Sequence, residues 1–269
     1  MLYLVATPIG NLGDFSERAR EVLEHVDLVA CEDTRTSRQL FSLLGIHVKK
    51  TIAYHDFNEE KATLPLIEKL KEGMEIALVS DAGMPLISDP GYHLVAECRR
   101  QNIPVTSVPG ANAVLMALQL SGLPTDSFYF GGFLPPKTGA RQNVLQEVQS
   151  LPATLIFYDT ARRLKEALSD IQKILGQRQM VVARELTKKF EEVKCGTPSE
   201  LEVYYTEAPK GEIVLVISGA DKKEAPKTTI TIDDLRKNLS AKDSAYVWAL
   251  VSGKSKKEAY ADVLAHDKL

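Results

Sequence analysis

Cysteine, charge excess and long apolar runs are all scarce in this 269-residue sequence, and each scarcity excludes a class of protein. Cys31, Cys98 and Cys195 are scattered and form no C-x-x-C pair, which argues against a disulfide framework and a zinc site. The net charge of −3 gives no overall attraction to nucleic acid or an anionic membrane, so a phosphate-bearing partner requires a local basic patch. No run is long enough to span a membrane and no basic leader precedes the first strand, so we expect a cytoplasmic protein.

What the sequence contains is typical of a soluble globular enzyme, since 44% of the residues are hydrophobic and 26% are charged. Short apolar runs alternate with segments of helical pattern up to residue 121, which predicts an α/β domain with a parallel sheet over 1–121. After a glycine- and proline-bearing hinge, the runs Met180–Arg184 and Glu191–Cys195 are joined by a short link. Such a link predicts a hairpin, and therefore a mixed sheet in a second α/β domain over 127–219.

The C-terminal part of the sequence differs from the rest. A charged, proline-bearing segment at 220–229 is expected to be a linker, and 230–269 a small helical region with a turn at 252–255. A lysine cluster follows that turn and is interpreted either as a solvated helix face or as a nucleic-acid contact.

Three predicted strands end in loops of small residues and proline. The run Ile76–Val79 breaks into Ser80-Asp81-Ala82-Gly83-Met84-Pro85, the first strand into Thr7-Pro8-Ile9-Gly10, and a third strand into Pro109-Gly110-Ala111. Each loop taken alone is equally consistent with an ordinary strand-to-helix turn. Ligands bind at the carboxyl ends of strands in open α/β sheets, where bare backbone lets them approach the main chain. Together the loops therefore predict a site for a polar ligand.

Another strand end, after Asp27–Cys31, is crowded with charge in Glu32-Asp33-Thr34-Arg35. Asp33 or Thr34 can cap the helix that follows, but a cap needs neither two acids nor an arginine. The planar guanidinium of Arg35 suits a phosphate. Asp89, by contrast, has a complete structural explanation as the cap of the next helix, and we predict no chemistry for it.

The ordered motifs of the sequence resemble one family. Thr7-Pro8-Ile9-Gly10-Asn11-Leu12, Glu32-Asp33-Thr34-Arg35, Ser80-Asp81-Ala82-Gly83, Pro85-Leu86-Ile87 and Asp89-Pro90-Gly91 are similar in order and spacing to the tetrapyrrole-methylase-like methyltransferases. Phe133-Leu134-Pro135, Arg184-Glu185-Leu186-Thr187-Lys188 and Lys210-Gly211-Glu212 resemble the branch that 2'-O-methylates a cytidine ribose in the decoding region of 16S ribosomal RNA. The resemblance covers roughly residues 2–219.

The resemblance implies a fold of two αβα domains with S-adenosylmethionine in the cleft between them, and a homodimer. The residues that it places against this cofactor are Pro8, Ser80, Asp81, Gly83, Pro85, Gly110, Ala111, Phe157, Tyr158, Leu186 and Gly211. The sequence departs from residues common in the branch at Met84, at Ala111 and over Asp159–Ala161.

The implied reaction depends first on alignment, because the sulfonium of S-adenosylmethionine is already activated. Positioning can supply on the order of 7–11 kcal/mol of the barrier, and a general base about 10²–10⁴-fold in rate. We expect no metal. The candidate bases are Asp33, Glu185 and Lys188, of which Lys188 can act as a base only if desolvation lowers its pKa.

The expected partner is 16S ribosomal RNA or the small ribosomal subunit, with neither DNA nor a membrane. Arg35, Lys137 and Arg162 are the candidates for contact with the RNA backbone, and Lys188 could join them. Two alternatives stay open: a sister methyltransferase acting on a tetrapyrrole such as a precorrin or on a protein, and a non-catalytic RNA-binding protein. The basic residues favour RNA, because a small substrate needs none of them.

Overall fold

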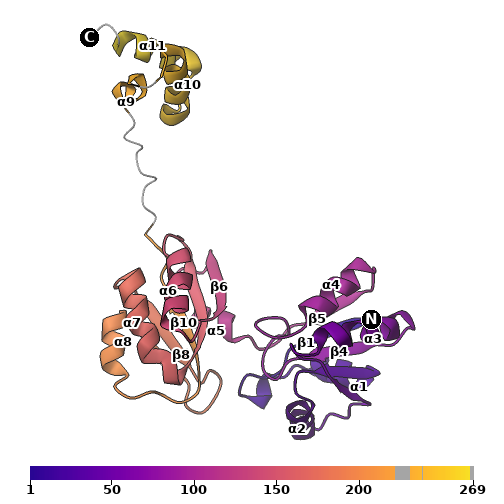
Figure 1. The fold of residues 1–269 in the computed structure, drawn as a ribbon. Coiled ribbons are helices and arrows are strands. Elements are labelled where there is room, and N and C mark those ends of the chain that lie inside the picture. Colours follow the sequence, from indigo (N-terminus) through magenta and orange to yellow (C-terminus); the bar gives the residue numbers. More distant parts are fainter. Residues whose placement is uncertain (222–230, 238, 267–269) are drawn as a thin grey trace. The chain divides into compact units, whose positions relative to one another are not determined.

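The computed structural model describes residues 1–221, 231–237 and 239–266, and the chain divides into two compact units, 1–219 and 220–269. The first unit contains two five-stranded sheets, each covered by helices (Figure 1). Most of the predicted linker at 220–229 lies outside the described residues.

The first sheet is wholly parallel, as predicted, with strand order β3-β2-β4-β1-β5. Its strands are β1 (Leu2–Val5), β2 (Leu28–Cys31), β3 (Thr51–Ala53), β4 (Ile76–Val79) and β5 (Val105–Val108). The helices between them are α1 (Glu17–His25), α2 (Thr34–Leu44), α3 (Glu59–Lys71) and α4 (Tyr92–Arg100), with a 3₁₀ turn, η1, at Leu12–Asp14.

Both faces of this sheet are buried, which explains why its central strands are continuous apolar runs. One face packs against α1 and α2 through Leu23 and Phe41, and the opposite face against α3 and α4 through Ile67 and Leu94. Every residue of β2 and β4 is buried. The strand ends that follow these buried runs are therefore fixed by the core.

The second sheet is mixed, with order β6-β7-β10-β8-β9, and within it the pair β6–β7 alone is parallel. Its strands are β6 (Phe128–Phe133), β7 (Thr154–Thr160), β8 (Met180–Arg184), β9 (Glu192–Gly196) and β10 (Glu212–Ile217). The predicted hairpin is confirmed, because β8 and β9 pair antiparallel with Met180 opposite Gly196.

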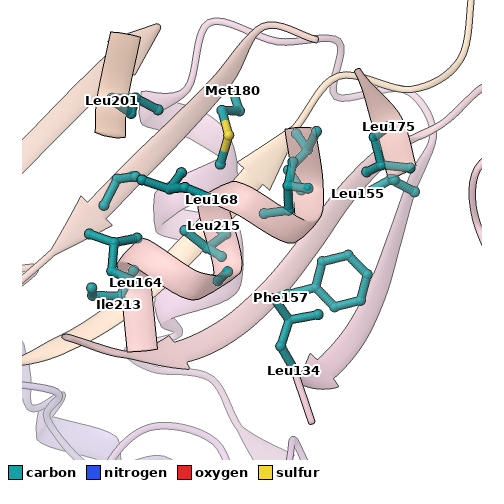
Figure 2. Close-up of a cluster of buried hydrophobic side chains, with 14 of the residues drawn as sticks. Leu134, Leu155, Phe157, Leu164, Leu168, Leu175, Met180, Leu201, Ile213 and Leu215 are labelled. Atoms are coloured by element: carbon teal, nitrogen blue, oxygen red, sulfur yellow. The ribbon is translucent and has the colours of Figure 1, made fainter. Parts of the chain in front are cut away.

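Three helices, α6 (Thr138–Glu147), α7 (Leu164–Leu175) and α8 (Pro198–Tyr204), contribute to the core on one face of the second sheet. Figure 2 shows how the apolar side of α7, with Leu164 and Leu168, packs over Leu155, Phe157 and Leu215 of the strands. Phe157 is completely buried in this core. The expectation that Phe157 faces the cofactor is therefore not supported by its position.

Helix α5 (Ala113–Leu120) packs on the other face of the second sheet, although it lies in the segment that we assigned to the first domain. Val114, Ala117 and Leu118 are buried against residues of β7, β8 and β10. The domain ranges 1–121 and 127–219 stay predictions. The packing shows that the chain passes from one sheet to the other before α5 begins.

Strand β7 extends beyond its apolar run. Asp159 and Thr160 pair with Ile213 and Glu212 of β10, and a 3₁₀ turn, η2 (Ala161–Arg163), follows. The longer strand results from this pairing with β10, a contact between segments far apart in the sequence.

The described part of the second unit contains α9 (Ile232–Arg236), α10 (Ala241–Ser252) and α11 (Lys256–His266). The predicted turn between the last two helices is confirmed, with Gly253 in the left-handed conformation at the end of α10. Among the described residues, no helix is both long enough and apolar enough to cross a membrane.

Candidate active site

The loops that follow β1, β4 and β5 meet at the carboxyl ends of their strands. The Thr7 N–H donates to the Gly83 carbonyl at 2.9 Å, and the Gly83 N–H donates back to the Thr7 carbonyl at 3.0 Å. The Ser80 hydroxyl also donates to the Gly83 carbonyl, at 3.2 Å. A Cβ placed on Gly83 would lie 3.4 Å from Ile9 and 3.8 Å from the Ala111 carbonyl. The predicted convergence of three small-residue corners is thus observed in the structure.

The same corner meets the second sheet through Gly10. A Cβ on Gly10 would collide with the Lys188 side chain and lie 2.9 Å from the Thr187 hydroxyl. A residue larger than glycine fits here only if the Lys188 and Thr187 side chains move. Gly10 therefore lets these two side chains pack against the loop after β1.

A cavity of about 280 Å³ lies where these loops meet, close to the lower end of the range of small-molecule sites, about 300–1,000 Å³. Both sheets contribute to its wall. Its lining residues are Ile9, Glu32, Asp81, Ala82, Gly83, Met84, Ile87, Ser88, Asp89, Asn112 and Ala113 from the loops of the first sheet and from α5, and Phe133, Tyr158, Asp159, Ala183, Glu185, Leu186, Lys188, Glu212, Ile213 and Val214 from the second sheet.

The backbone beside this cavity is strained. Leu86 and Ser88 in one loop, and Glu185 and Thr187 in the facing loop, have positive φ values of 72°, 64°, 50° and 66°. Such conformations cost non-glycine residues on the order of 1–3 kcal/mol each and tend to occur at functional sites. Of the described non-glycine residues with positive φ, one more, Asn102, lies away from the cavity.

Carboxyl groups gather on the wall contributed by the first sheet. Burial, followed by the nearby Asp81, raises the pKa of Glu32, and burial is also the main reason that the pKa of Asp81 is raised. Burial, reinforced by the charges of Glu32, Asp81 and Asp56, raises the pKa of Asp89 to about 7, against a smaller opposing effect of a hydrogen bond with Ser80. Asp81 thus raises the pKa of both Glu32 and Asp89, because like charges disfavour ionisation of a neighbouring carboxyl.

The opposite wall holds an ion pair. Lys188 Nζ donates to Glu185 Oε1 at 2.9 Å, and both side chains line the cavity. Gly211 lies against the Glu185 carboxylate, with no room for a side chain between them. Tyr158 lies on the same wall, and its pKa is raised to about 12 by burial and by the charges of Asp89 and Glu212.

The structure places the predicted site residues in three groups. Asp81, Gly83, Tyr158, Glu185, Leu186 and Lys188 line the cavity. Pro8, Ser80, Pro85, Gly110, Ala111 and Gly211 belong to the loops that form it but are not part of its lining, and Phe157 lies in the core.

Asp33 and the predicted RNA-binding residues lie outside the cavity lining. Asp33 caps α2, and the Arg35 guanidinium, 2.7 Å from its carboxylate, holds the pKa of that carboxyl well below its usual range. The capping interpretation of Asp33 is therefore confirmed. Arg35, Lys137 and Arg162 are exposed.

Sequence reasoning missed Asp89. The expected cap is absent, because α4 has Gly91 at its N-cap position with no side-chain cap, and Asp89 lines the cavity instead. Leu86 and Ser88, which both have positive φ, direct the loop so that Asp89 reaches the cavity. A cluster of serine, aspartate, proline and glycine after a strand end was the available signal, and it also fits a cap.

The chain is similar to known proteins over nearly its whole length. A family model described as "Tetrapyrrole (Corrin/Porphyrin) Methylases" matches residues 1–202. The ribosomal RNA small subunit methyltransferase I of Haemophilus influenzae is 44% identical over 99% of this chain and 97% of its own length. The protein of the same name from Vibrio cholerae is 45% identical over 97% of this chain and 93% of its own length.

Among solved structures, diphthine synthase superposes with a TM-score of 0.63 at 16% identity, covering 81% of this chain and 89% of that chain. Uroporphyrin-III-C-methyltransferase from Thermus thermophilus superposes with a TM-score of 0.53 at 21% identity, covering 80% and 93%. These similarities support the fold.

The fold and the cavity define a two-sheet α/β protein with a cavity for a small molecule at the ends of its strands. The chain belongs to the tetrapyrrole methylase family. The family and fold class expected from the sequence are thereby confirmed, and with them an S-adenosylmethionine-dependent methyltransferase.

The residues of the cavity fit S-adenosylmethionine. Its sulfonium and ammonium groups are cationic, and Glu32 and Asp81 supply carboxyls that form no salt bridge with the described residues. Ile9 and Leu186 supply apolar surface.

Proposed function

We propose that this protein methylates the RNA of the small ribosomal subunit, at the 2'-hydroxyl of a cytidine ribose in the decoding region of 16S ribosomal RNA. One observation carries the proposal: relatives named ribosomal RNA small subunit methyltransferase I are 44–45% identical to this chain over nearly its whole length. The cavity at the strand ends, with its open backbone and carboxyl groups, supports a site for the methyl donor. A cytoplasmic homodimer is part of the same proposal.

In this proposal the loops of the first sheet hold the donor. Asp81 offers a carboxylate fixed by the Asp33 N–H at 3.2 Å, and Gly83 offers main chain without a side chain in the way. Leu186 and Tyr158 close the site from the second sheet. The remaining loop residues expected at the cofactor, Pro8, Ser80, Pro85, Gly110, Ala111 and Gly211, shape these walls without lining them.

The acceptor is held by the chain's cationic residues. Lys188 reaches the cavity, and the exposed Arg35, Lys137 and Arg162 are available to phosphates of the RNA backbone. The bound donor supplies a methyl group on a sulfonium that needs no further activation. What the chain itself contributes is alignment of the acceptor hydroxyl, which is the larger share of the catalysis.

The test is a map of ribose methyl groups on small-subunit RNA by mass spectrometry, from cells with and without the gene. We expect one cytidine methyl in the decoding region to disappear, and to return with the wild-type gene but not with Asp81→Ala. An unchanged map would contradict the proposed substrate. Loss of a base methyl instead of a ribose methyl would overturn the 2'-O assignment alone.

A further inference from the structure

Asp89 differs from three other carboxyls of the cavity, each of which has a cation or a backbone N–H as its partner. Glu185 is paired with Lys188, Asp159 with Arg163 at 2.7 Å, and Asp81 accepts the Asp33 N–H. Among the described residues, no lysine, arginine or histidine forms a salt bridge with Asp89, and the polar side chain beside it is the Ser80 hydroxyl. Its carboxylate can therefore take a proton without breaking an ion pair.

Asp89 lines the cavity on the side of the first sheet and lies near residues of the second sheet. Its neighbour Ser88 approaches β6 of the second sheet, because a Cβ on Gly132 would lie 3.6 Å from the Ser88 hydroxyl. Tyr158, on the opposite wall, is close enough for the charge of Asp89 to raise its pKa. The side chain is half-buried and held by a strained turn, in which Ser88 has φ 64°. Such strain persists only where surrounding structure enforces it.

We propose that Asp89 is the proton acceptor of the reaction, taking the hydrogen of the acceptor hydroxyl as methyl transfer proceeds. The proposal rests on the proposed function, since it requires a hydroxyl as the methyl acceptor. The O–H bond of the ribose breaks and its proton moves to an Asp89 carboxylate oxygen. The hydroxyl oxygen bonds to the methyl carbon, and the electrons of the broken carbon–sulfur bond stay on sulfur, which leaves as a neutral thioether.

The surroundings suit this role at neutral pH. Glu32, Asp81 and Asp56 face Asp89 from the loops after β2, β4 and β3, while Ser80 and Tyr158 are its uncharged polar neighbours. Burial and these negative charges keep its pKa at about 7. A base with a pKa near the working pH is available in its ionised form and still accepts a proton readily.

The other candidates serve less well. Asp33 is outside the cavity lining, and its carboxylate is neutralised by Arg35 with its pKa well below the usual range, which makes it a weak base. Glu185 would have to give up its ion pair with Lys188. Lys188 is engaged in that same ion pair, where its Nζ donates to Glu185 Oε1 at 2.9 Å.

The test compares wild type with Asp89→Asn, Asp89→Glu and Asp56→Asn in single-turnover transfer of a labelled methyl to small ribosomal subunits lacking this modification. We expect Asp89→Asn to lower the rate constant by about 10²–10⁴-fold, and Asp89→Glu, which keeps the carboxylate, to recover part of the rate. The affinity for S-adenosylmethionine by calorimetry and the thermal midpoint report separately whether the variants bind the donor and fold.

The pH profile gives the sharper readout. The wild-type rate should rise as the pH rises through about 7, since the base must be ionised, and this limb should be absent in Asp89→Asn. Asp56→Asn removes one of the negative charges beside Asp89 and should move the limb to lower pH at full maximal rate. Folded, donor-binding Asp89→Asn with wild-type rate and profile would overturn the inference. Wild type that transfers no methyl to the subunits would instead overturn the proposed function.

Discussion

The carboxyl groups of Asp170 and Asp89 have opposite surroundings, although both are withdrawn from water in the same unit of the chain. Asp170 accepts from Arg141 Nε at 2.7 Å and from the Gln142 amide at 2.6 Å, and the Arg141 and Asp170 side chains are 2% and 8% exposed. Arg141 also donates to the carbonyls of Pro135 and Pro136, both at 3.3 Å. Asp89 forms no salt bridge with any described residue and lies among other acids, namely Glu32, Asp81 and Asp56.

This difference indicates that Asp170 has a structural role and that Asp89 has a chemical one. Around Asp170 each buried polar group has a partner, so the network fixes the loop after β6 onto α7 and α6. Around Asp89 the fold retains an unfavourable cluster of carboxyls beside a strained turn. Carboxyls with shifted pKa values in a cavity are typical of functional sites, because catalysis there requires charge arrangements that destabilise the fold.

The largest effect tests the paired region. Arg141→Ala leaves the Asp170 carboxylate buried without its cation, and we expect a loss of about 3–5 kcal/mol in the free energy of unfolding. Urea denaturation measures it. The double variant Arg141→Met/Asp170→Leu removes both charges and should recover most of the loss. A loss below about 1 kcal/mol in the single variant would show that the pair is not buried in solution.

The next effect separates strain from binding at the cavity. Gly83→Ala and Gly73→Ala both place a side chain at positive φ, 87° and 94°, and each should cost about 1–2 kcal/mol in stability. Gly73 has nothing within 4 Å of an added Cβ and lies outside the cavity lining, so it is the matched control. Calorimetry should show about tenfold weaker S-adenosylmethionine binding for Gly83→Ala only. Equal affinities would remove Gly83 from the donor site.

A smaller effect has the opposite sign. The pKa of Asp89 is about 7 in the folded protein and about 4 in the unfolded chain. The contribution of Asp89 to the free energy of unfolding is therefore most favourable below about pH 4 and is lost as the pH rises to about 7. Asp89→Asn removes this penalty and should raise the thermal midpoint at pH 8 and leave it unchanged at pH 4. Scanning calorimetry across this range decides it. A lowered midpoint at pH 8 would make Asp89 a structural residue like Asp170.

The smallest effect on stability is expected at Arg35. Its guanidinium is exposed and its ion pair with Asp33 lies in solvent, so Arg35→Ala should leave the thermal midpoint unchanged within about 1 °C. Methyl transfer to small subunits should nevertheless slow, with a steeper effect at low salt, if Arg35 contacts phosphate. Lys49→Ala, which removes another exposed cation paired with an aspartate, is the control. Equal rates in the two variants would remove Arg35 from the RNA contact.

The elements of the fold could be predicted wherever local pattern decides them. The buried run Ile76–Val79, the cap at Asp33 and the left-handed glycine at the end of α2 follow from apolar periodicity and capping chemistry, and all three are observed. The convergence of the small-residue loops could also be predicted, because parallel strands bring their carboxyl ends to one edge.

What could not be predicted depends on contacts between distant segments. Helix α5 follows the last strand of the first sheet but packs on the second, because its apolar face covers β10 and β7 there. Phe157 reads as a site residue by resemblance, yet alternation along β7 turns it into the core. In the sequence Asp89 is typical of a helix cap, and only the turn at Leu86 and Ser88, seen in the structure, places it at the cavity.

The most direct test of the donor site is the affinity of Asp81→Ala for S-adenosylmethionine by isothermal titration calorimetry. Asp27→Ala is the matched control, since Asp27 also accepts a backbone N–H, from Glu75 at 3.0 Å, but precedes β2 at the other end of the sheet. A charge-assisted hydrogen bond is about 1.5–3 kcal/mol, so we predict a roughly 10–150-fold loss of affinity in Asp81→Ala and none in Asp27→Ala. Wild-type affinity in Asp81→Ala would contradict the assignment of the cavity to the methyl donor.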